Sequence, residues 1–580
     1  MGKIQKGISY LKQYGIKEML VRMNRRYVTL DKEYAIWYDK HCCTREELEN
    51  QREYKFQFSP TISILTPVYN TPLNFLKEMI DSVCDQTYQN WELCIANASP
   101  DNQELATILE KFQENEERIK VIDVPANLGI AQNTNAALEI ASGEYIGLLD
   151  HDDLLASNAL YEIVRELNKG KQIDVLYTDE DKIDSEGKTH FQPNFKPDFN
   201  IDLLRSNNYI CHFFVVKKEI MLSLQGFRSE YDGAQDYDLF LRCIDQTKCI
   251  AHIPKILYHW RVHQTSTADN PASKMYAYEA GKKAIEDHLR RNHQKGLVEI
   301  GNDLGFYRIR YELNSNPIVS VIILNKDDVK SLKRTIDALE KCCYRNLEII
   351  LVGCTDRKDT ESFYKQLQKR KQYKVLSWTK ECKYTSIMNK AIRKSSGEYI
   401  LLLDEKLKIK NIEYIQELLS NCIRKDVGLV GGKSYYKNMD IHNAGIILRK
   451  DFSLDKVFYR QPKNVVGYMH RESLQQNLSA LLSENLMFSK NDFQEVGGFF
   501  ENINNKEVAV IDLAMKMQET GKTIVFNPYA ESIYVDNSAE RKEKVDLKEL
   551  EYLQKKWGHK LDDGDPAYNE NLDLNYKLKI

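Results

Sequence analysis

The chain has 580 residues, of which 42% are hydrophobic and 29% charged, and its formal net charge is -3. This composition excludes collagen-like and disordered chains and predicts roughly two to four globular domains. The near-neutral charge gives no argument for nucleic-acid binding. No apolar run approaches the roughly 18 residues of a membrane span, and the opening residues lack the apolar core of a secretory signal.

The twelve cysteines are scattered without a CxxC pair. This usage predicts reduced thiols, with neither a disulfide framework nor a zinc site. We therefore expect a cytoplasmic protein, either dissolved or held on the inner face of the cell membrane.

Residues 1–58 are predicted to form a helical N-terminal region. Residues 1–30 carry seven Lys and Arg against one acid, with apolar side chains at roughly helical spacing. Such a basic amphipathic helix either lies on an anionic membrane surface or packs on the protein body with a solvated basic face. Residues 31–58 continue as polar helix, with a helix start at Thr44–Glu47, and then as a linker.

From Thr61 onward, short apolar runs alternate with amphipathic stretches. Strands are predicted at 61–70, 91–99, 121–129 and 144–149, and helices at 72–87, 103–117, 130–141 and 154–167. This alternation predicts βαβ units on a parallel sheet. The carboxyl ends of such strands share one edge of the sheet, which is where α/β proteins bind ligands.

The most informative stretch is 142–154, SGEYIGLLDHDDL. A buried apolar run ends in Asp150, His151, Asp152 and Asp153. Acids this close repel one another unless a cation lies between them, and hard divalent ions such as Mg²⁺ or Mn²⁺ prefer carboxylate oxygens. Alternatively, Asp152 or Asp153 caps the helix predicted to follow.

After residue 169 the alternation loosens. A strand at 174–184, DVLYTDEDKID, runs into an acidic loop, and a second strand follows at 211–220. The segment 226–243 passes from a glycine-rich loop into an amphipathic helix, and YHWRVHQTST at 258–267 closes the unit.

The pattern then begins again. PIVSVIILNKDD at 317–328 repeats TISILTPVYN, and SSGEYILLLDEKL at 395–407 repeats ASGEYIGLLDHDDL. An ordered repeat with a period of about 255 residues by this alignment indicates a duplicated domain, because solenoid repeats are far shorter. We predict a first copy at 59–312, a second at 313–540 and a helical tail at 541–580.

These pieces resemble the family-2 glycosyltransferases with a GT-A fold, in particular bacterial enzymes that build cell-surface polysaccharides. The motifs that carry the resemblance are SILTPVYN (63–70), NLGIAQNTNAAL (127–138), SGEYIGLLDHDD (142–153), GAQDYDLFLR (233–242) and HWRVHQTSTA (259–268). The resemblance implies an α/β chain of two tandem GT-A (Rossmann-like) domains. It implies an inverting, metal-dependent transferase moving a sugar from a UDP- or dTDP-sugar to a growing polysaccharide or lipid-linked glycan.

The resemblance also implies a donor site. The loop with Pro67 and Tyr69 would line the base and ribose, and Arg261 would hold the diphosphate. Asn97 stands where the family usually has an aspartate facing the base. Mn²⁺ or Mg²⁺ would be held by Asp150 and Asp152, with Asp153 and His263 as further ligands; His263 could equally be an ordinary loop histidine.

The resemblance places the general base at Asp236, where a carboxylate in the first turn of a helix can take the acceptor proton. The alternative is that Asp236 only caps this helix, and Asp238 is the lesser candidate for the base. Acceptor hydroxyls are predicted to contact Asp179, Glu180 and Asp181, unless these three acids form a solvated loop.

The second copy keeps the scaffold and departs from the motifs, with Asp404-Glu405-Lys406-Leu407 in place of the first copy's acids. The position matching Asp236 falls near Val510, with Glu507 close by. We expect a degenerate module kept for packing, acceptor binding or partner contact, the alternative being a second active transferase.

Rival functions for the whole chain are a non-catalytic scaffold of a polysaccharide assembly complex and a nucleotidyltransferase. The latter usually has a glycine-rich phosphate loop, which 66–70 lacks.

Overall fold

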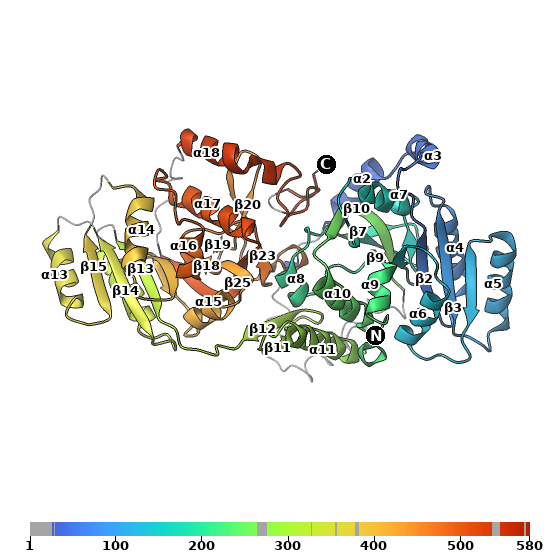
Figure 1. Cartoon of the computed structure of the whole chain (residues 1–580), viewed down its shortest axis with the longest axis horizontal. Helices are drawn as coiled ribbons and strands as arrows, with labels where there is room; N and C mark the ends of the chain where they lie inside the picture. The colour runs from blue at the N-terminus through green and yellow to red at the C-terminus, as the bar shows by residue number, and fades with distance from the viewer. Residues whose placement is uncertain are drawn as a thin grey trace. The chain divides into compact units, whose positions relative to one another are not determined.

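The computed structural model describes residues 30–263, 275–325, 328–353, 357–377, 382–535, 546–573 and 576–579, together with the backbone of 26–27. The chain divides into two compact units (Figure 1). The N-terminal unit comprises Leu30–Glu312, Pro566–Asp573 and Lys577–Ile580; the C-terminal unit comprises Leu313–Asp565, Met1–Thr29 and Leu574–Tyr576. This division differs from the predicted boundaries at both ends, because 31–58 group with the first copy and the tail 541–580 is shared.

The N-terminal unit follows the predicted alternation of strands and helices. Its elements are α2 (Asp31–His41), α3 (Arg45–Glu53), β2 (Ile62–Val68), α4 (Leu73–Cys84), β3 (Trp91–Asn97), α5 (Gln103–Asn115), β4 (Ile119–Asp123), α6 (Ile130–Glu139), β5 (Tyr145–Leu148), β6 (Leu154–Leu155), α7 (Ala159–Leu167), β7 (Val175–Ile183), β8 (His190–Asn194), α8 (Ile201–Ser206), β9 (Phe214–Lys217), α9 (Lys218–Ser223), α10 (Gln235–Gln246), β10 (Ile250–Arg261), α11 (Met275–Arg291), β11 (Gly296–Ile300) and β12 (Tyr307–Tyr311).

The main sheet of this unit has the order β4-β3-β2-β5-β9-β7-β10-β6, with β8 paired to β7. Strands β4, β3, β2 and β5 are parallel, β9 is antiparallel to both of its neighbours, and β7 and β10 are again parallel. Helices flank the sheet (Figure 1). The carboxyl ends of β2, β3, β4 and β5 therefore lie at one edge, as predicted.

Apolar burial explains why these segments adopt these elements. Every residue of β2 is buried, as expected for a central strand covered on both faces. Helix α4 buries Phe75, Leu76, Met79, Ile80 and Val83 at helical spacing. The predicted helix start at Thr44 is confirmed, because Thr44 and Glu47 form a capping box.

One predicted helix begins later than expected. Leu154–Leu155 form β6, which pairs antiparallel with Tyr258 and His259 of β10, and α7 begins at Ala159. Pairing with a neighbouring strand outweighs the local preference for helix here. Neither Asp152 nor Asp153 therefore caps α7, whose N-cap residue is Asn158.

The C-terminal unit repeats the same plan. Its elements are β13 (Val319–Asn325), α12 (Val329–Leu339), β14 (Leu347–Gly353), α13 (Lys358–Leu367), β15 (Tyr373–Ser377), α14 (Tyr384–Lys394), β16 (Tyr399–Asp404), β17 (Leu407–Ile409), α15 (Tyr414–Cys422), β18 (Val427–Tyr435), β19 (Ile441–Asn443), β20 (Ile446–Leu448), β21 (Leu454–Lys456), β22 (Val465–Val466), β23 (Gln476–Asn477), β24 (Asn485–Ser489), α16 (Lys490–Glu495), α17 (Lys506–Glu519), β25 (Thr523–Tyr534) and α18 (Leu547–Trp557). The short β1 (Arg26–Tyr27) pairs with β22.

The sheet order in the C-terminal unit, β15-β14-β13-β16-β24-β18-β25-β17, matches that of the first sheet strand for strand. The two α/β copies predicted from the sequence are therefore confirmed. Among the described residues, no helix combines the length and apolar character needed to cross a bilayer.

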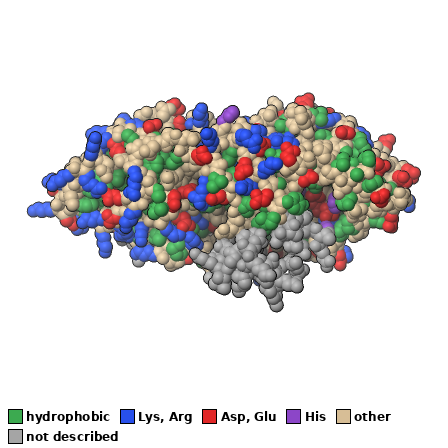
Figure 2. Space-filling view, turned by 90° about the horizontal axis from the view of Figure 1, so that it is seen from below, with side chains coloured by type: hydrophobic (Ala, Val, Ile, Leu, Met, Phe, Trp, Pro, Cys, Tyr) green, Lys and Arg blue, Asp and Glu red, His purple; other side chains and the backbone are tan. Residues whose placement is uncertain are grey.

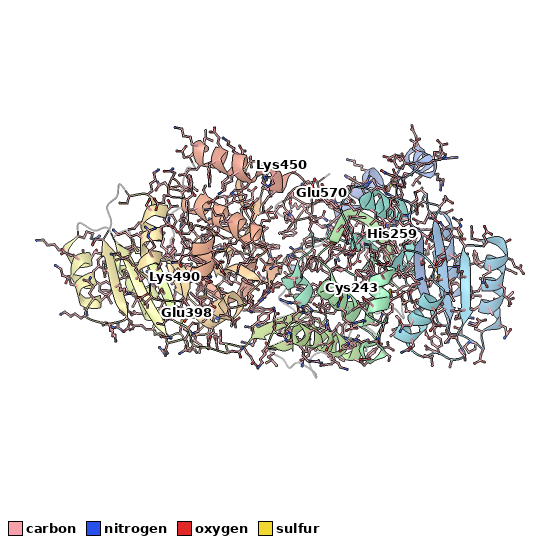
Figure 3. All side chains as sticks on the ribbon, viewed as in Figure 1. Cys243, His259, Glu398, Lys450, Lys490 and Glu570 are labelled. Atoms are coloured by element: carbon pink, nitrogen blue, oxygen red, sulfur yellow. The ribbon has the colours of Figure 1, made fainter. Side chains whose placement is uncertain are left out.

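The duplication extends to individual side chains. Glu92 accepts hydrogen bonds from Ser63, Ser142 and Lys120, and Glu348 accepts from Ser320, Ser396 and Lys374 in the same arrangement. A lysine amide also donates to a glutamate carbonyl in both units, as Lys218 to Glu144 and as Lys490 to Glu398, the latter pair labelled in Figure 3.

The lowered pKa values of Glu92 and Glu348 make the stability of each unit depend on pH. Burial raises the pKa of Glu92, but the Lys120 ammonium and the bonds from Ser142 and Ser63 outweigh it and lower the pKa to about 2. The stabilisation is thus complete above the unfolded pKa near 4.5 and is lost as pH falls toward about 2. We expect Glu92→Gln to lower the free energy of unfolding by about 3 kcal/mol at neutral pH and by much less near pH 3, measured by urea denaturation.

Glu348→Gln provides the matched change in the C-terminal unit, because the pKa of Glu348 is also lowered to about 2, with burial opposing and Lys374 and two serines favouring the charge. An equal loss of stability at neutral and acid pH in both variants would contradict this assignment.

Candidate active site

One pocket of the N-terminal unit brings together residues that the sequence places far apart. Its lining includes Pro67 of β2, Asp150 just after β5 and Asp236 in the first turn of α10. His212 and Tyr258 also line it. The structure therefore joins a predicted donor residue, a predicted metal ligand and the predicted base in a single site.

Asp236 lies at the second residue of α10 without capping it. The N-cap position is Ala234, and no side chain caps the helix. Asn208 donates a hydrogen bond from Nδ2 to Asp236 Oδ2 at 3.1 Å. This bond orients the carboxylate within the pocket, so the capping alternative does not describe its position.

Asp238, the lesser candidate for the base, faces the protein interior. Its side chain is fully buried and forms ion pairs with Arg228 and Arg242, the latter at 2.9 Å. A carboxylate held by two guanidinium groups and shielded from solvent has a structural role. The structure thus separates the two acids clearly.

The first two acids after β5 contact histidines. The Asp150 side chain is about half exposed, and its Oδ2 lies 3.9 Å from His212 Nε2. Asp152 Oδ2 lies 2.7 Å from His263 Nε2. Desolvation in the pocket raises the pKa of Asp150, the Asp152 charge adds to this effect and His212 opposes it. Carboxylates and an imidazole are the ligand types that suit a divalent cation, but among the described residues only Asp181, His190 and His259 bring three such ligand atoms within 4.8 Å of one another.

Asp153 differs from its prediction as a metal ligand. The residue is 1% exposed; one carboxylate oxygen accepts from Tyr258 OH at 2.6 Å and the other from the Arg261 amide at 2.8 Å. Burial raises the pKa of Asp153 well above its ordinary value, and the charges of Asp152 and Asp150 add to the rise. Asp153 therefore links the acidic turn to β10 through Tyr258 and Arg261, and both of its oxygens are used in these bonds.

Arg261 also differs from its prediction as a diphosphate ligand. Its side chain is fully buried, and the guanidinium donates to Glu78 at 2.6 Å, to the Asp152 carbonyl at 2.8 Å and to the Ser185 carbonyl at 3.1 Å. All three of its nitrogens bind protein groups, so Arg261 supports the backbone of the acidic turn.

The predicted acidic loop is wrong, because Asp179, Glu180 and Asp181 lie inside strand β7 and are buried. Each acid has a basic partner from a distant segment. Asp179 pairs with His252 at 2.8 Å, and Glu180 pairs with Lys196 at 3.2 Å. These pairings leave Asp179 and Asp181, which are both 0% exposed, out of reach of an acceptor.

Asp181 contacts two histidines and a tyrosine. Its oxygens lie 2.7 Å from His190 Nδ1 and 2.6 Å from His259 Nδ1, and Tyr34 OH donates to it at 2.7 Å. Figure 3 labels His259 on β10. Among the described residues, Asp181, His190 and His259 have ligand atoms close enough to share a metal ion. The distances from the Asp181 oxygens to the two imidazole nitrogens are nevertheless hydrogen-bond lengths. The cluster fastens α2, through Tyr34, to the sheet.

Asn97, expected at the nucleobase, is 3% exposed. Its amide donates to Asp123 Oδ1 at 2.8 Å and its oxygen accepts from the Ser99 amide at 3.1 Å. Asp123, at the end of β4, is exposed, and so is Tyr69, at 48%. A carboxylate from the neighbouring strand β4 therefore lies directly beside Asn97.

The sequence did not single out His212, Asn208 or Asp123. Burial lowers the pKa of His212, but the carboxylates of Glu180 and Asp150 outweigh it and raise the pKa to about 9. A cation therefore faces Asp150 from the pocket wall. The sequence around His212 does not indicate that it faces Asp150, because its partners come from β7 and from the turn after β5.

The equivalent place in the C-terminal unit holds an internal cation. Asp404 ends β16, and Lys506 Nζ lies 3.4 Å from its Oδ2 and 3.9 Å from Glu507 Oε1. Glu507 is the second residue of α17, as Asp236 is of α10, whereas Val510 is fully buried. Lys506 therefore offsets the negative charge of Asp404 and Glu507.

The strand order and the acids at the end of the central strand define the GT-A class of sugar-transfer folds. The family model named glycosyl transferase family 2 matches residues 63–223 and 320–496, one stretch in each unit. The chain therefore belongs to glycosyl transferase family 2, as the sequence motifs predicted.

Two relatives match along most of this chain. An uncharacterised protein of Sinorhizobium fredii is 35% identical over 90% of the chain and 58% of its own length. An O-antigen biosynthesis protein of Myxococcus xanthus is 31% identical over 89% of the chain and 40% of its own length. The chain thus spans about half the length of these relatives.

A further match is shorter. Chondroitin synthase of Pasteurella multocida is 31% identical over 36% of the chain and 21% of its own length. Among solved structures, TarS of S. aureus in complex with UDP-GlcNAc covers 40% of the chain and 66% of its own, at 18% identity and a TM-score of 0.34.

Proposed function

We propose that the N-terminal unit transfers a sugar, with inversion, from a nucleotide-sugar donor to a growing polysaccharide or lipid-linked glycan. The observation that carries this proposal is the shared pocket of Asp150 and Asp236, which sets the acid that we propose as a cation ligand beside a hydrogen-bonded carboxylate. The O-antigen relative supports a glycan as the acceptor.

The chemistry at Asp236 is a single displacement. The carboxylate takes the proton of the acceptor hydroxyl while that oxygen attacks the anomeric carbon. The bond from the anomeric carbon to the diphosphate breaks, and the nucleoside diphosphate leaves with the bonding electron pair. Attack opposite the leaving group inverts the anomeric centre. Asn208 holds one oxygen of Asp236, so the other can accept the proton.

Asp150, Asp152 and His263 are the residues that would hold Mn²⁺ or Mg²⁺, because their oxygens and imidazole suit such ions; the hydrogen bond between His263 and Asp152 would have to open to admit the ion. A bound cation would act as a Lewis acid that stabilises the charge on the departing diphosphate. Pro67 and Tyr69 would line the nucleoside, and Asp123, steadied by Asn97, would face the base. Glu180 contacts His212, which lines the pocket, and would act on an acceptor only through that histidine.

Hydrolysis of UDP-, dTDP- and GDP-sugars by the purified chain, with Mn²⁺ or Mg²⁺ and with EDTA, tests this function. We expect one nucleotide to be released in a metal-dependent manner, and calorimetry to show binding of the same nucleoside diphosphate. Absence of both turnover and nucleotide binding across the panel would reject the proposal.

We propose that the C-terminal unit is not catalytic, because Lys406 stands at the position of Asp152 and Lys506 pairs with Asp404, the counterpart of Asp150. Asp404→Ala should therefore leave the metal-dependent hydrolysis intact.

A further inference from the structure

The C-terminal unit carries a cluster of basic side chains that its N-terminal copy lacks. The segment 358–394, from α13 through β15 to α14, contains eleven Lys and Arg and three acids. The matching segment 103–139, from α5 through β4 to α6, contains three Lys and Arg and seven acids. The same three elements therefore have opposite charge in the two units.

We call the exposed bases of this segment the basic face. Its described members are Lys358, Lys365, Lys369, Arg370, Lys371, Lys374, Lys383, Lys390, Arg393 and Lys394, all of them exposed. Figure 2 shows Lys and Arg side chains gathered at the end of the C-terminal unit that carries α13. This concentration of one sign creates a positive local potential.

Few of these bases are neutralised within the unit. Lys365 pairs with Glu361 at 2.7 Å, Arg370 with Glu340 at 2.6 Å, and Lys374 with Glu348. Among the described residues, no carboxylate lies within ion-pair distance of the remaining seven. An unneutralised cluster of this size costs self-repulsion, which an anionic partner would relieve.

Protection of the sheet edge does not account for the basic face. Charged side chains, often Lys, on an edge strand prevent unwanted pairing, and β15 is such a strand. The N-terminal unit meets the same need at its edge strand β4 with Lys120, which is paired with Glu92 just as Lys374 is with Glu348. The excess charge lies on and around the two helices.

We propose that the basic face docks the chain onto an anionic membrane surface through phospholipid headgroups. Such contact needs many exposed cations and no apolar insertion. None of the large hydrophobic side chains exposed in the described part of the chain falls within 358–394, so the described residues of this segment offer no exposed aromatic ring for stacking sugars. Helices α13 and α14 flank the edge strand β15 from opposite faces of the sheet, so the bases surround this end of the sheet, where Lys374 and Lys394 line one pocket. This proposal is independent of the sugar-transfer proposal.

Co-sedimentation of the full chain with vesicles tests the proposal. We expect binding to phosphatidylcholine mixed with phosphatidylglycerol, no binding to phosphatidylcholine alone, and loss of binding as salt screens the charges. The variant K369E/K371E/K394E should bind anionic vesicles about tenfold more weakly.

The matched control is K55E/K77E/K111E, three exposed lysines of the N-terminal unit, which makes the same change in net charge. This variant should bind vesicles as the unchanged chain does, and circular dichroism should show both variants folded. Three results would overturn the proposal: no binding to anionic vesicles, equal weakening by both variants, or unchanged binding by the basic-face variant, which would assign the contact to another surface. Binding to an acidic polysaccharide in place of vesicles would also overturn it.

Discussion

Replacing Asp236 by Asn is expected to lower the rate of sugar transfer by about 10²- to 10⁴-fold, the range that a general base contributes. The amide keeps the shape of the carboxylate and a hydrogen-bonding side chain for Asn208, but it cannot accept a proton. Binding of the donor nucleotide should change little, because Asp236 acts on the acceptor. Steady-state transfer rates and calorimetric nucleotide affinities, measured on the same preparation, separate the two effects.

The C-terminal unit offers the matched control. Glu507→Gln changes the residue at the same place in α17, where the carboxylate is bound to the Ser483 amide and hydroxyl at 2.9 Å. Burial raises the pKa of Glu507, and Lys506 opposes that rise. Transfer should survive Glu507→Gln. If Glu507→Gln abolished transfer and Asp236→Asn did not, chemistry would have to be assigned to the C-terminal unit.

The features that the sequence predicted correctly are those encoded within a single segment. The apolar run before Asp150, the helix that carries Asp236 and the repeat of both in the second copy are local patterns, and the structure confirms the duplicated α/β plan. Burial of β2 on both faces follows from seven residues in a row. Such patterns suffice to place the edge of the sheet where the site lies.

The features that the sequence did not predict depend on partners from distant segments. Three adjacent acids in TDED at 178–181 predict a polar loop. The segment is instead a buried strand, because Lys196, His252 and His259, which come from other parts of the chain, pair with these acids. Arg261 was expected to bind the donor diphosphate because its sequence neighbours do not reveal that its guanidinium has a partner within the protein. The structure shows that this partner is Glu78 from helix α4. Pairing of buried charges belongs to the tertiary structure.

Asp123 shows that a departure from a motif can be compensated in space. Asn97 removes the carboxylate from the end of β3, and its amide then holds a carboxylate from the end of β4. A comparison by sequence position finds only the loss. Asp123, hydrogen-bonded to Asn97, is therefore our candidate for the negative charge that the family motif would place at position 97.

Removing Asp152 is expected to abolish metal-dependent turnover, with a loss of about 10²- to 10³-fold, comparable to removing one preorganised group that stabilises developing charge. Asp152 is partly exposed and touches His263, so its loss should not unfold the unit. Asp404→Ala removes the acid at the end of β16, which matches Asp150 of the first copy, and should leave turnover and metal affinity unaltered.

Asp153→Asn separates a metal ligand from a structural acid. Asp153 accepts from Tyr258 OH and the Arg261 amide, so its replacement should lower the melting temperature while metal affinity is retained. Mn²⁺ titration followed by calorimetry, with thermal unfolding of each variant, measures both quantities. Retained Mn²⁺ affinity in Asp152→Ala together with lost affinity in Asp153→Asn would reverse the assignment and move the metal site behind the acidic turn.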